Sequence, residues 1–194
     1  MQDIKLIPFK NIDSKINKYH IINEFNNQLK FIVNNVYAPY GYQNIKNQYR
    51  FNITDFKREK SNNIGAKNYS LRIINESFND FINNIKLYEK YFSDFIELKD
   101  YKLNSNILKN KEHNIIIRCH LKTCKKVDSY NNIITSFKEY NNGIFEDKMW
   151  LDYNKSYRLN IICSFDSFWI NHITKEYGIS ICVIIVKQFN NLKN

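Results

Sequence analysis

The sequence predicts one mixed α+β domain, mainly β, that spans residues 1–194 and contains one long amphipathic helix. Several segments alternate apolar with polar residues, as half-buried strands do. One segment repeats its apolar residues every three or four positions, as a helix with one buried face does. The 194 residues are 43% hydrophobic and include four glycines and two prolines. That composition is enough for one core and leaves no long flexible linker.

The predicted helix covers about residues 78–96. Its apolar positions fall on one face, and they are Phe78, Phe81, Ile82, Ile85, Tyr88, Phe92, Phe95 and Ile96. Ser77 is the predicted N-cap. Asp80, in the first turn, would meet the positive end of the helix dipole.

The predicted strands are spread along the chain. In chain order the candidates are Tyr49–Thr54, Ile115–Ile117, Ile133–Phe137, Tyr157–Phe165 and Ile179–Val186. The last is apolar on both faces, which indicates a strand covered on each side. The segment Leu29–Tyr37 is either a strand or the end of a helix that begins near Asp13. The polar segments Asp55–Lys67 and Lys99–Asn114 are predicted to be loops.

The net charge is +10, and a basic surface attracts polyanions. Asn, Ile, Lys, Tyr and Phe dominate the composition, and all five have codons rich in A and T. We infer an AT-rich genome, so the excess of lysine can reflect codon supply as well as function.

The sequence predicts a soluble, intracellular protein without a membrane partner. The first residues lack the apolar core of a signal peptide, and the longest apolar run, near Ile179–Val186, is too short to span a bilayer. In that compartment the cysteines are expected to be reduced thiols. They are Cys119, Cys124, Cys163 and Cys182.

The sequence contains no phosphate-binding glycine loop, no dinucleotide fingerprint, no HExxH motif and no nucleophile elbow. We therefore predict that the protein is not an enzyme and uses no cofactor.

Two arrangements suggest a metal, but each matches its pattern poorly. A zinc site would need His113, Cys119, His120 and Cys124, whose spacing fits no usual zinc finger, so we predict no metal site. Glu97 and Lys99, with Asp94 before them, resemble half of a metal-dependent nuclease site, which needs further carboxylates.

Basic and aromatic residues cluster near the predicted strands. Basic residues surround the strand at Tyr49, and others follow Ile115–Ile117. Proteins that hold single strands combine cationic grooves with rings that stack on bases. The candidate binding residues are Tyr40, Tyr42, Lys46, Arg50, Arg118, Lys122, Lys125, Lys126, Trp150, Arg158 and Trp169. Tyr49 and Phe51 are expected in the core, while Arg158 should face outward.

Several stretches of the chain resemble a known family. In the C-terminal part these are residues 155–165, residues 168–171 with Trp169, residues 177–180 with Gly178, and residues 185–189, which include Gln188. In the N-terminal part they are residues 29–33, 38–42 and 49–56, and the helix from Phe78 follows. Together they resemble the single-stranded-DNA-binding proteins of large eukaryotic DNA viruses.

The resemblance implies an OB-like antiparallel β-barrel that coats exposed single strands during replication, recombination or repair. Binding would be largely independent of sequence and would need no hydrolysis. The protein would act in the host cytoplasm or nucleus, at viral replication sites. RNA as a ligand and a homo-oligomer on DNA are left open. The alternatives are a viral protein-interaction module, which needs an exposed apolar patch, and a small metal-dependent nuclease.

Overall fold

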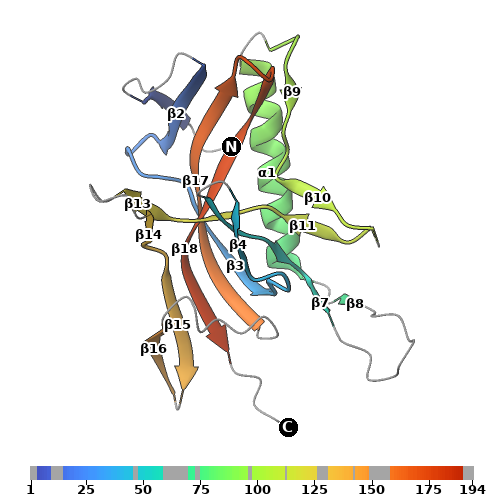
Figure 1. Cartoon of the computed structure of the whole chain (residues 1–194), viewed down its shortest axis with the longest axis vertical. Helices are drawn as coiled ribbons and strands as arrows, with labels where there is room; N and C mark the ends of the chain where they lie inside the picture. The colour runs from blue at the N-terminus through green and yellow to red at the C-terminus, as the bar shows by residue number, and fades with distance from the viewer. Residues whose placement is uncertain are drawn as a thin grey trace.

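The computed structural model describes residues 4–9, 15–45, 48–58, 70–72, 75–95, 98–111, 113–125, 131–141, 143–148 and 158–189. These residues form a mainly β structure with a long helix, α1 (Glu76–Phe95), as predicted (Figure 1). Within these ranges the sheets are not closed into a barrel. No helix among them is both long and apolar enough to cross a bilayer.

A long antiparallel ribbon organises the fold. It consists of β17 (Arg158–Asn171) and β18 (Glu176–Phe189), joined by a four-residue turn. Both strands are rich in Ile, Val, Phe and Cys, which suit a surface packed on both sides. Figure 1 shows the two strands running the length of the molecule beside α1.

Shorter strands pair with both edges of this ribbon. The free edge of β17 pairs with β2 (Ile16–Asn23) and β3 (Lys30–Val36), and β1 (Ile4–Pro8) continues the sheet beyond β2. The free edge of β18 pairs in parallel with β9 (Lys102–Leu103), β12 (His120–Leu121) and β15 (Ser136–Asn141). The hairpin partner of β15 is β16 (Ile144–Lys148). The sheet is therefore mixed, with parallel pairs along this edge of β18 and antiparallel pairs elsewhere.

The remaining strands extend or flank this sheet. β5 (Gln48–Phe51) pairs with β12 and with β4 (Tyr42–Ile45), and β6 (Ile53–Thr54) pairs with β11 (Ile115–Ile117), which pairs with β10 (Ile107–Lys109). Two small hairpins are β7 (Phe56–Arg58) with β8 (Ser70–Arg72), and β13 (Thr123–Lys125) with β14 (Asn131–Ile133). Beyond β3, Tyr37 and Thr54 exchange two backbone hydrogen bonds of 2.9 Å.

The core lies between α1 and one face of the ribbon. The ring of Phe92 stacks on Phe168 with the centroids 4.5 Å apart, and Tyr88 meets Phe165 edge-on at 5.3 Å. Phe81 also contacts Phe165. Because the apolar spacing of α1 matches a helix with one buried face, these rings cover the sheet and leave the polar side of the helix in solvent.

Two irregularities in the pairing of β17 with β18 keep the apolar side chains of both strands on the core side. The register skips Asp166 in β17 and Ile184 in β18. One extra residue reverses the alternation that follows it. As a result Phe165 and Phe168, which are three residues apart, both face α1.

The helix begins earlier than predicted, and its N-cap differs. The Oδ1 atom of Asn75 accepts a hydrogen bond from the backbone N–H of Phe78 at 3.1 Å, so Asn75 caps the helix. The predicted cap, Ser77, lies inside the first turn. Its hydroxyl donates to the carbonyl of Ile32 and accepts from the N–H of Asn34. Ser77 therefore ties α1 to β3.

Other predictions are corrected in part. Residues 29–37 include strand β3, and the proposed helix from Asp13 was wrong, because β2 occupies that region. The segment Lys99–Asn114 contains β9 and β10 as well as loops, and Asp55–Lys67 begins with β7, while its residues 59–67 lie outside the described residues. Strands this short show no periodicity in the sequence.

We predict that Asn75→Ala lowers the free energy of unfolding by about 2 kcal/mol, measured by urea denaturation. The amide loses the helix cap, and its Nδ2 atom no longer donates to the carbonyls of Asn34 and Asn35, at 2.8 and 2.9 Å. The matched control is Asn83→Ala, which removes an exposed amide from the same helix and should change stability by less than about 0.5 kcal/mol. Equal losses in both variants would contradict this role for Asn75.

Candidate nucleic-acid interface

The ribbon has two faces with different chemistry. One face carries the core residues against α1. The side chains of the other face, here called the outer face, follow from the strand register, because paired residues point to the same side. In β17 they are Arg158, Asn160, Ile162, Ser164, Ser167 and Trp169, and in β18 they are Gly178, Ser180, Cys182, Ile185, Lys187 and Phe189. Most of these residues are polar or partly exposed.

Basic side chains from other strands join the middle of the outer face. His120 is the register partner of both Cys182 and Arg50. Arg118 and Lys122 lie two positions before and after His120, so they point to the same side, while Cys119 and Leu121 are buried in the core. Lys18 joins them from β2, where it pairs with Trp169. Segments far apart in the sequence thus place four cations and a histidine on one face.

A close contact sets the position of Trp169. A Cβ atom on Gly178 would lie 3.0 Å from the Cζ2 atom of the Trp169 ring and 2.9 Å from the carbonyl oxygen of Asn104. Glycine therefore lets the half-buried indole lie across β18. The same Asn104 accepts a hydrogen bond from Arg118 Nη2 through its Oδ1 atom, at 2.5 Å. Asn104 therefore lies next to both Gly178 and Arg118.

A buried network holds Arg118. Its Nη2 atom also donates to the carbonyl of Ser105 at 3.1 Å. The Glu89 carboxylate accepts from Ser105 Oγ at 3.0 Å and from the N–H of Asn106 at 3.1 Å, and burial raises the pKa of this carboxyl. Asn106 Nδ2 donates to the carbonyl of Ile179 at 2.6 Å. Helix α1 and β18 together fix the loop on which the guanidinium rests.

The basic cluster on the outer face is electrostatically strained. Burial, together with the positive charges of Arg118, Arg50 and Lys18, lowers the pKa of His120 to about 4. Burial and the charge of Arg50 also lower the pKa of Arg118, while the carboxylates of Glu89 and Glu176 offset part of this effect. No carboxylate of the described residues forms an ion pair with Lys18, Arg50, Arg118 or Lys122. Such a cluster is expected to attract an anion.

Two polar atoms of this cluster are buried without a hydrogen-bond partner in the described part of the chain: Arg50 Nε and His120 Nδ1. A buried polar group in a native protein almost always has a hydrogen-bond partner. Two neighbouring polar atoms without one therefore indicate a position for water or a ligand. Because an arginine Nε always carries a proton, an acceptor oxygen would satisfy it.

Five of the predicted binding residues lie on the outer face: Arg50, Arg118, Lys122, Arg158 and Trp169. Arg158 is exposed, as expected, and Phe51 is buried while Tyr49 packs partly buried against the core.

The structure describes the other candidates only in part. Tyr40 is half-buried in the turn before β4, where Gly41 has a φ of 62°. Tyr42 lies in β4 and Lys125 in β13, but the structure describes only their backbone and not their side chains. Lys46, Lys126 and Trp150 fall outside the described residues altogether.

Lys18 and His120 were missed as binding candidates. Arg118, His120 and Lys122 alternate at two-residue spacing, which places three basic groups on one face of a strand, so the sequence did contain a signal for His120. Lys18 gives no such signal, because only the pairing of β2 with β17 brings it to Trp169.

The metal alternatives gain no geometric support. Cys119 is buried in the core while the adjacent His120 points to the outer face, and His113 is exposed in the turn between β10 and β11. Asp94 and Lys99 are exposed, and Glu97 lies outside the described residues. Among the residues that could be searched, no three His, Cys, Asp or Glu side chains are grouped to hold a metal ion.

Comparison with known proteins adds no relative: no protein-family model matches the chain, and no curated protein matches its sequence. A functional proposal therefore depends on the chemistry of the outer face.

We predict that the stability of the protein falls as the pH is lowered from about 6.5 towards 4, in part because of His120. Its pKa is lower in the folded protein than the 6.5 of an ordinary histidine, so the unfolded chain binds the proton first. Between pH 7.5 and 5 this effect should cost about 2 kcal/mol. Urea denaturation of the wild type and His120→Gln at both pH values measures it. The same pH dependence in both proteins would contradict the assignment.

We also predict that Gly178→Ala displaces the Trp169 ring or the Asn104 carbonyl and destabilises the protein by about 1–3 kcal/mol. In a Trp150→Phe background, the emission of Trp169 should shift as its surroundings change. Ser180→Ala, on the same face and two residues away, should leave the emission unchanged.

Proposed function

We propose that the outer face binds single-stranded nucleic acid with little sequence preference. The observation that carries this proposal is the half-buried basic cluster of Arg50, Arg118 and His120, joined by Lys18, beside the Trp169 ring. Proteins that hold single strands combine these two elements, cations for the phosphates and rings for the bases.

In the proposed mechanism the phosphates replace water at the basic cluster. Each neutralised phosphate releases counterions, so affinity should fall steeply with salt. The negative charge of a phosphate would relieve the repulsion between Arg50 and Arg118. A base could stack on Trp169, and such stacking is worth about 1–3 kcal/mol.

A single strand suits this site better than a duplex. The cluster and the indole are half-buried, and two atoms of the Trp169 ring lie close against Gly178. The bases of a duplex are already stacked on one another, whereas an unpaired base can turn towards a ring. Because phosphates and ring faces are common to all nucleotides, this mode of binding gives little sequence discrimination.

We further propose that the described strands belong to an OB-like barrel of the viral single-stranded-DNA-binding type. Strand pairing runs from β3 through β17, β18 and β12 to β5, and the Tyr37–Thr54 bridge links the end of β3 to β6, just beyond β5. OB folds are five-stranded and partly open, so incomplete closure is compatible with this type. On this proposal the protein coats single strands at viral replication sites without catalysis or a cofactor.

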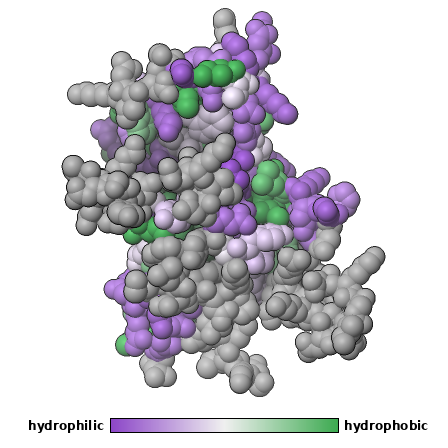
Figure 2. Space-filling model, in the orientation of Figure 1, coloured by the Kyte–Doolittle hydropathy of each residue, from purple (hydrophilic) through white to green (hydrophobic). Residues whose placement is uncertain are grey.

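The protein-interaction alternative would need a contiguous apolar patch. Several exposed apolar side chains lie on separate elements, among them Phe25 in the turn after β2, Ile32 in β3 and Ile173 in the turn between β17 and β18. In Figure 2 the hydrophobic areas visible among the described residues are small and separated by hydrophilic ones. Two groups are contiguous: the contacting rings of Tyr140, Phe145 and Phe189, and the row of Ile32, Ile162 and Ile185 on the outer face. Lys187 lies over the Phe145 ring and two positions from Ile185, so cations border this apolar surface, which favours the nucleic-acid proposal.

We predict that Arg50→Ala and Lys18→Ala each weaken binding to a 16-nucleotide oligo-dT about three- to tenfold. Each variant should also make the dependence of log K on log salt shallower by about 0.7, because one phosphate contact is lost. Fluorescence anisotropy at several salt concentrations measures both quantities, with a duplex of equal length as a weaker ligand.

The control is Lys86→Ala, which removes one positive charge from the exposed side of α1, away from the outer face. Its affinity and salt dependence should stay close to those of the wild type. If all three variants lose the same affinity, binding depends on the net charge of the protein and not on a site at the outer face. If the wild type binds duplex as tightly as oligo-dT, the single-strand proposal is wrong.

A further inference from the structure

A row of aromatic side chains crosses the far end of the outer face. Arg158, Phe189, Tyr140 and Phe145 are successive register partners on β17, β18, β15 and β16. Paired residues point to the same side of a sheet, so this row shares the face of Trp169. We call Tyr140, Phe145 and Phe189 the ring row.

The three rings contact one another and remain partly open to solvent. The centroid distances are 5.2 Å from Tyr140 to Phe145, 5.5 Å from Phe145 to Phe189 and 5.9 Å from Tyr140 to Phe189. Tyr140 is 38% exposed and Phe145 is 36% exposed. A cluster of this kind offers ring surface without unfolding any part of the core.

Basic side chains border the ring row. Lys187 Nζ lies 5.0 Å from the centre of the Phe145 ring, a cation–π contact, and Arg158 is exposed at the end of the row. Lys138, the register partner of Lys187, forms a 3.2 Å ion pair with Asp147. The combination of open rings and cations is the one already present around Trp169.

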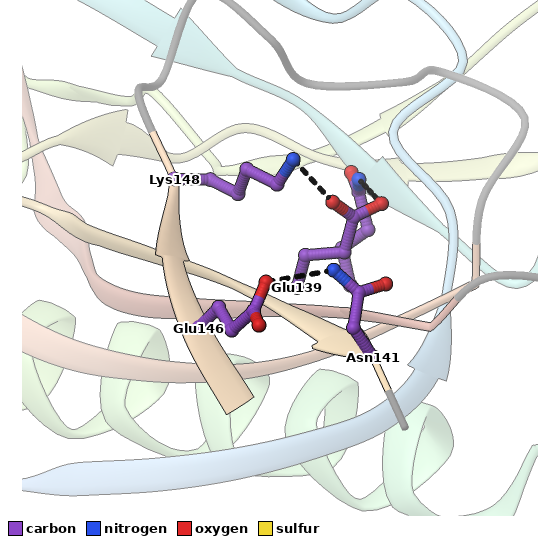
Figure 3. Close-up of polar contacts among 5 residues, drawn as sticks. Glu139, Asn141, Glu146 and Lys148 are labelled. Carbon is purple, nitrogen blue, oxygen red and sulfur yellow. Dashed lines mark hydrogen bonds and ion pairs between the residues drawn. The ribbon is translucent and has the colours of Figure 1, made fainter. Parts of the chain in front are cut away.

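Polar contacts on the opposite face hold the ring row in place. Lys148 Nζ pairs with Glu139 at 2.7 Å, and Gln188 Nε2 donates to the same carboxylate at 3.3 Å (Figure 3). Asn141 Nδ2 donates to Glu146 at 2.9 Å. These bonds join β15 to β16 and to β18. The hairpin that carries the rings is therefore held in place by these contacts. Because its side chains are already ordered, binding has a lower entropy cost.

We propose that the ring row is a second base-stacking site for the same single strand whose phosphates lie in the basic cluster. This inference rests on the function proposed above. Trp169 and Arg158 are eleven positions apart in β17, which corresponds to about 35 Å of strand. A ligand that reaches both ends would occupy the long end of the range of about 4–16 nucleotides known for OB folds.

The test uses Tyr140→Ser and Phe145→Ser, separately and together, in the full chain. We expect the double variant to bind a 16-nucleotide oligo-dT about tenfold more weakly, since stacked bases are lost. Because no cation is removed, the salt dependence should be unchanged. Titration of poly-dT, followed by Trp169 emission in a Trp150→Phe background, should show fewer nucleotides covered per protein.

The matched control is Phe25→Ser, which removes a ring that is 73% exposed in the turn between β2 and β3. It should leave both affinity and covered length unchanged. Lys187→Ala, which keeps all three rings, should make the salt dependence shallower by about 0.7.

The outcomes separate the two proposals. If the ring-row variants and Lys187→Ala bind like the wild type while Arg50→Ala binds more weakly, the ring row does not stack bases, although the proposed function stands. The rings would then be open to a protein partner instead. If the wild type fails to bind oligo-dT at low salt, both proposals are wrong.

Discussion

The packing of α1 against the β17–β18 ribbon is the constraint on which the rest of the structure depends. Phe165 and Phe168 must both meet the helix, and simple alternation cannot place residues three positions apart on one side. The bulge at Asp166 resolves this conflict, and it also turns Trp169 to the opposite face. One extra residue thus fixes both the core and the site.

This division lets the outer face carry groups that would destabilise a core. Arg50, Arg118 and His120 repel one another when protonated, and two of their polar atoms are unpaired. Buried aromatic packing against α1 compensates for that cost, because each buried ring contributes a few kcal/mol. Unfavourable electrostatics at a site is commonly a sign of a ligand whose charge is complementary.

The main elements could be predicted from the sequence, but their ends and connections could not. The spacing of Phe78 to Phe92 gave the helix, and the alternation around Phe51 and Leu159 gave strands. Ser77 was mistaken for the cap because Asn75, two residues earlier, has equally suitable chemistry. The strands β9 and β10 are too short to show a period.

The candidate site was predictable only where its residues lie close together in the sequence. Arg118 and Lys122 stood out because they are near each other, and Arg50 because other basic residues surround it. Lys18 depends on the pairing of β2 with β17, which joins residues about 150 positions apart, and the ring row depends on the pairing of β15 with β18, which joins residues 49 positions apart. No local pattern contains that information, since register is a tertiary property.

The distance in sequence between α1 and the ribbon also bears on how the chain folds. The aromatic side of α1 is complete at residue 95, and Phe31 of β3 can already contact Phe81, yet the ribbon that covers Tyr88 and Phe92 begins at residue 158. During synthesis the second half of the helix would have to wait for more than sixty further residues with these rings in water. Chains whose core contacts join residues far apart in the sequence fold slowly, and they expose apolar surface until those contacts form. We therefore expect the newly made protein to depend on chaperones more than a helical bundle of the same length would.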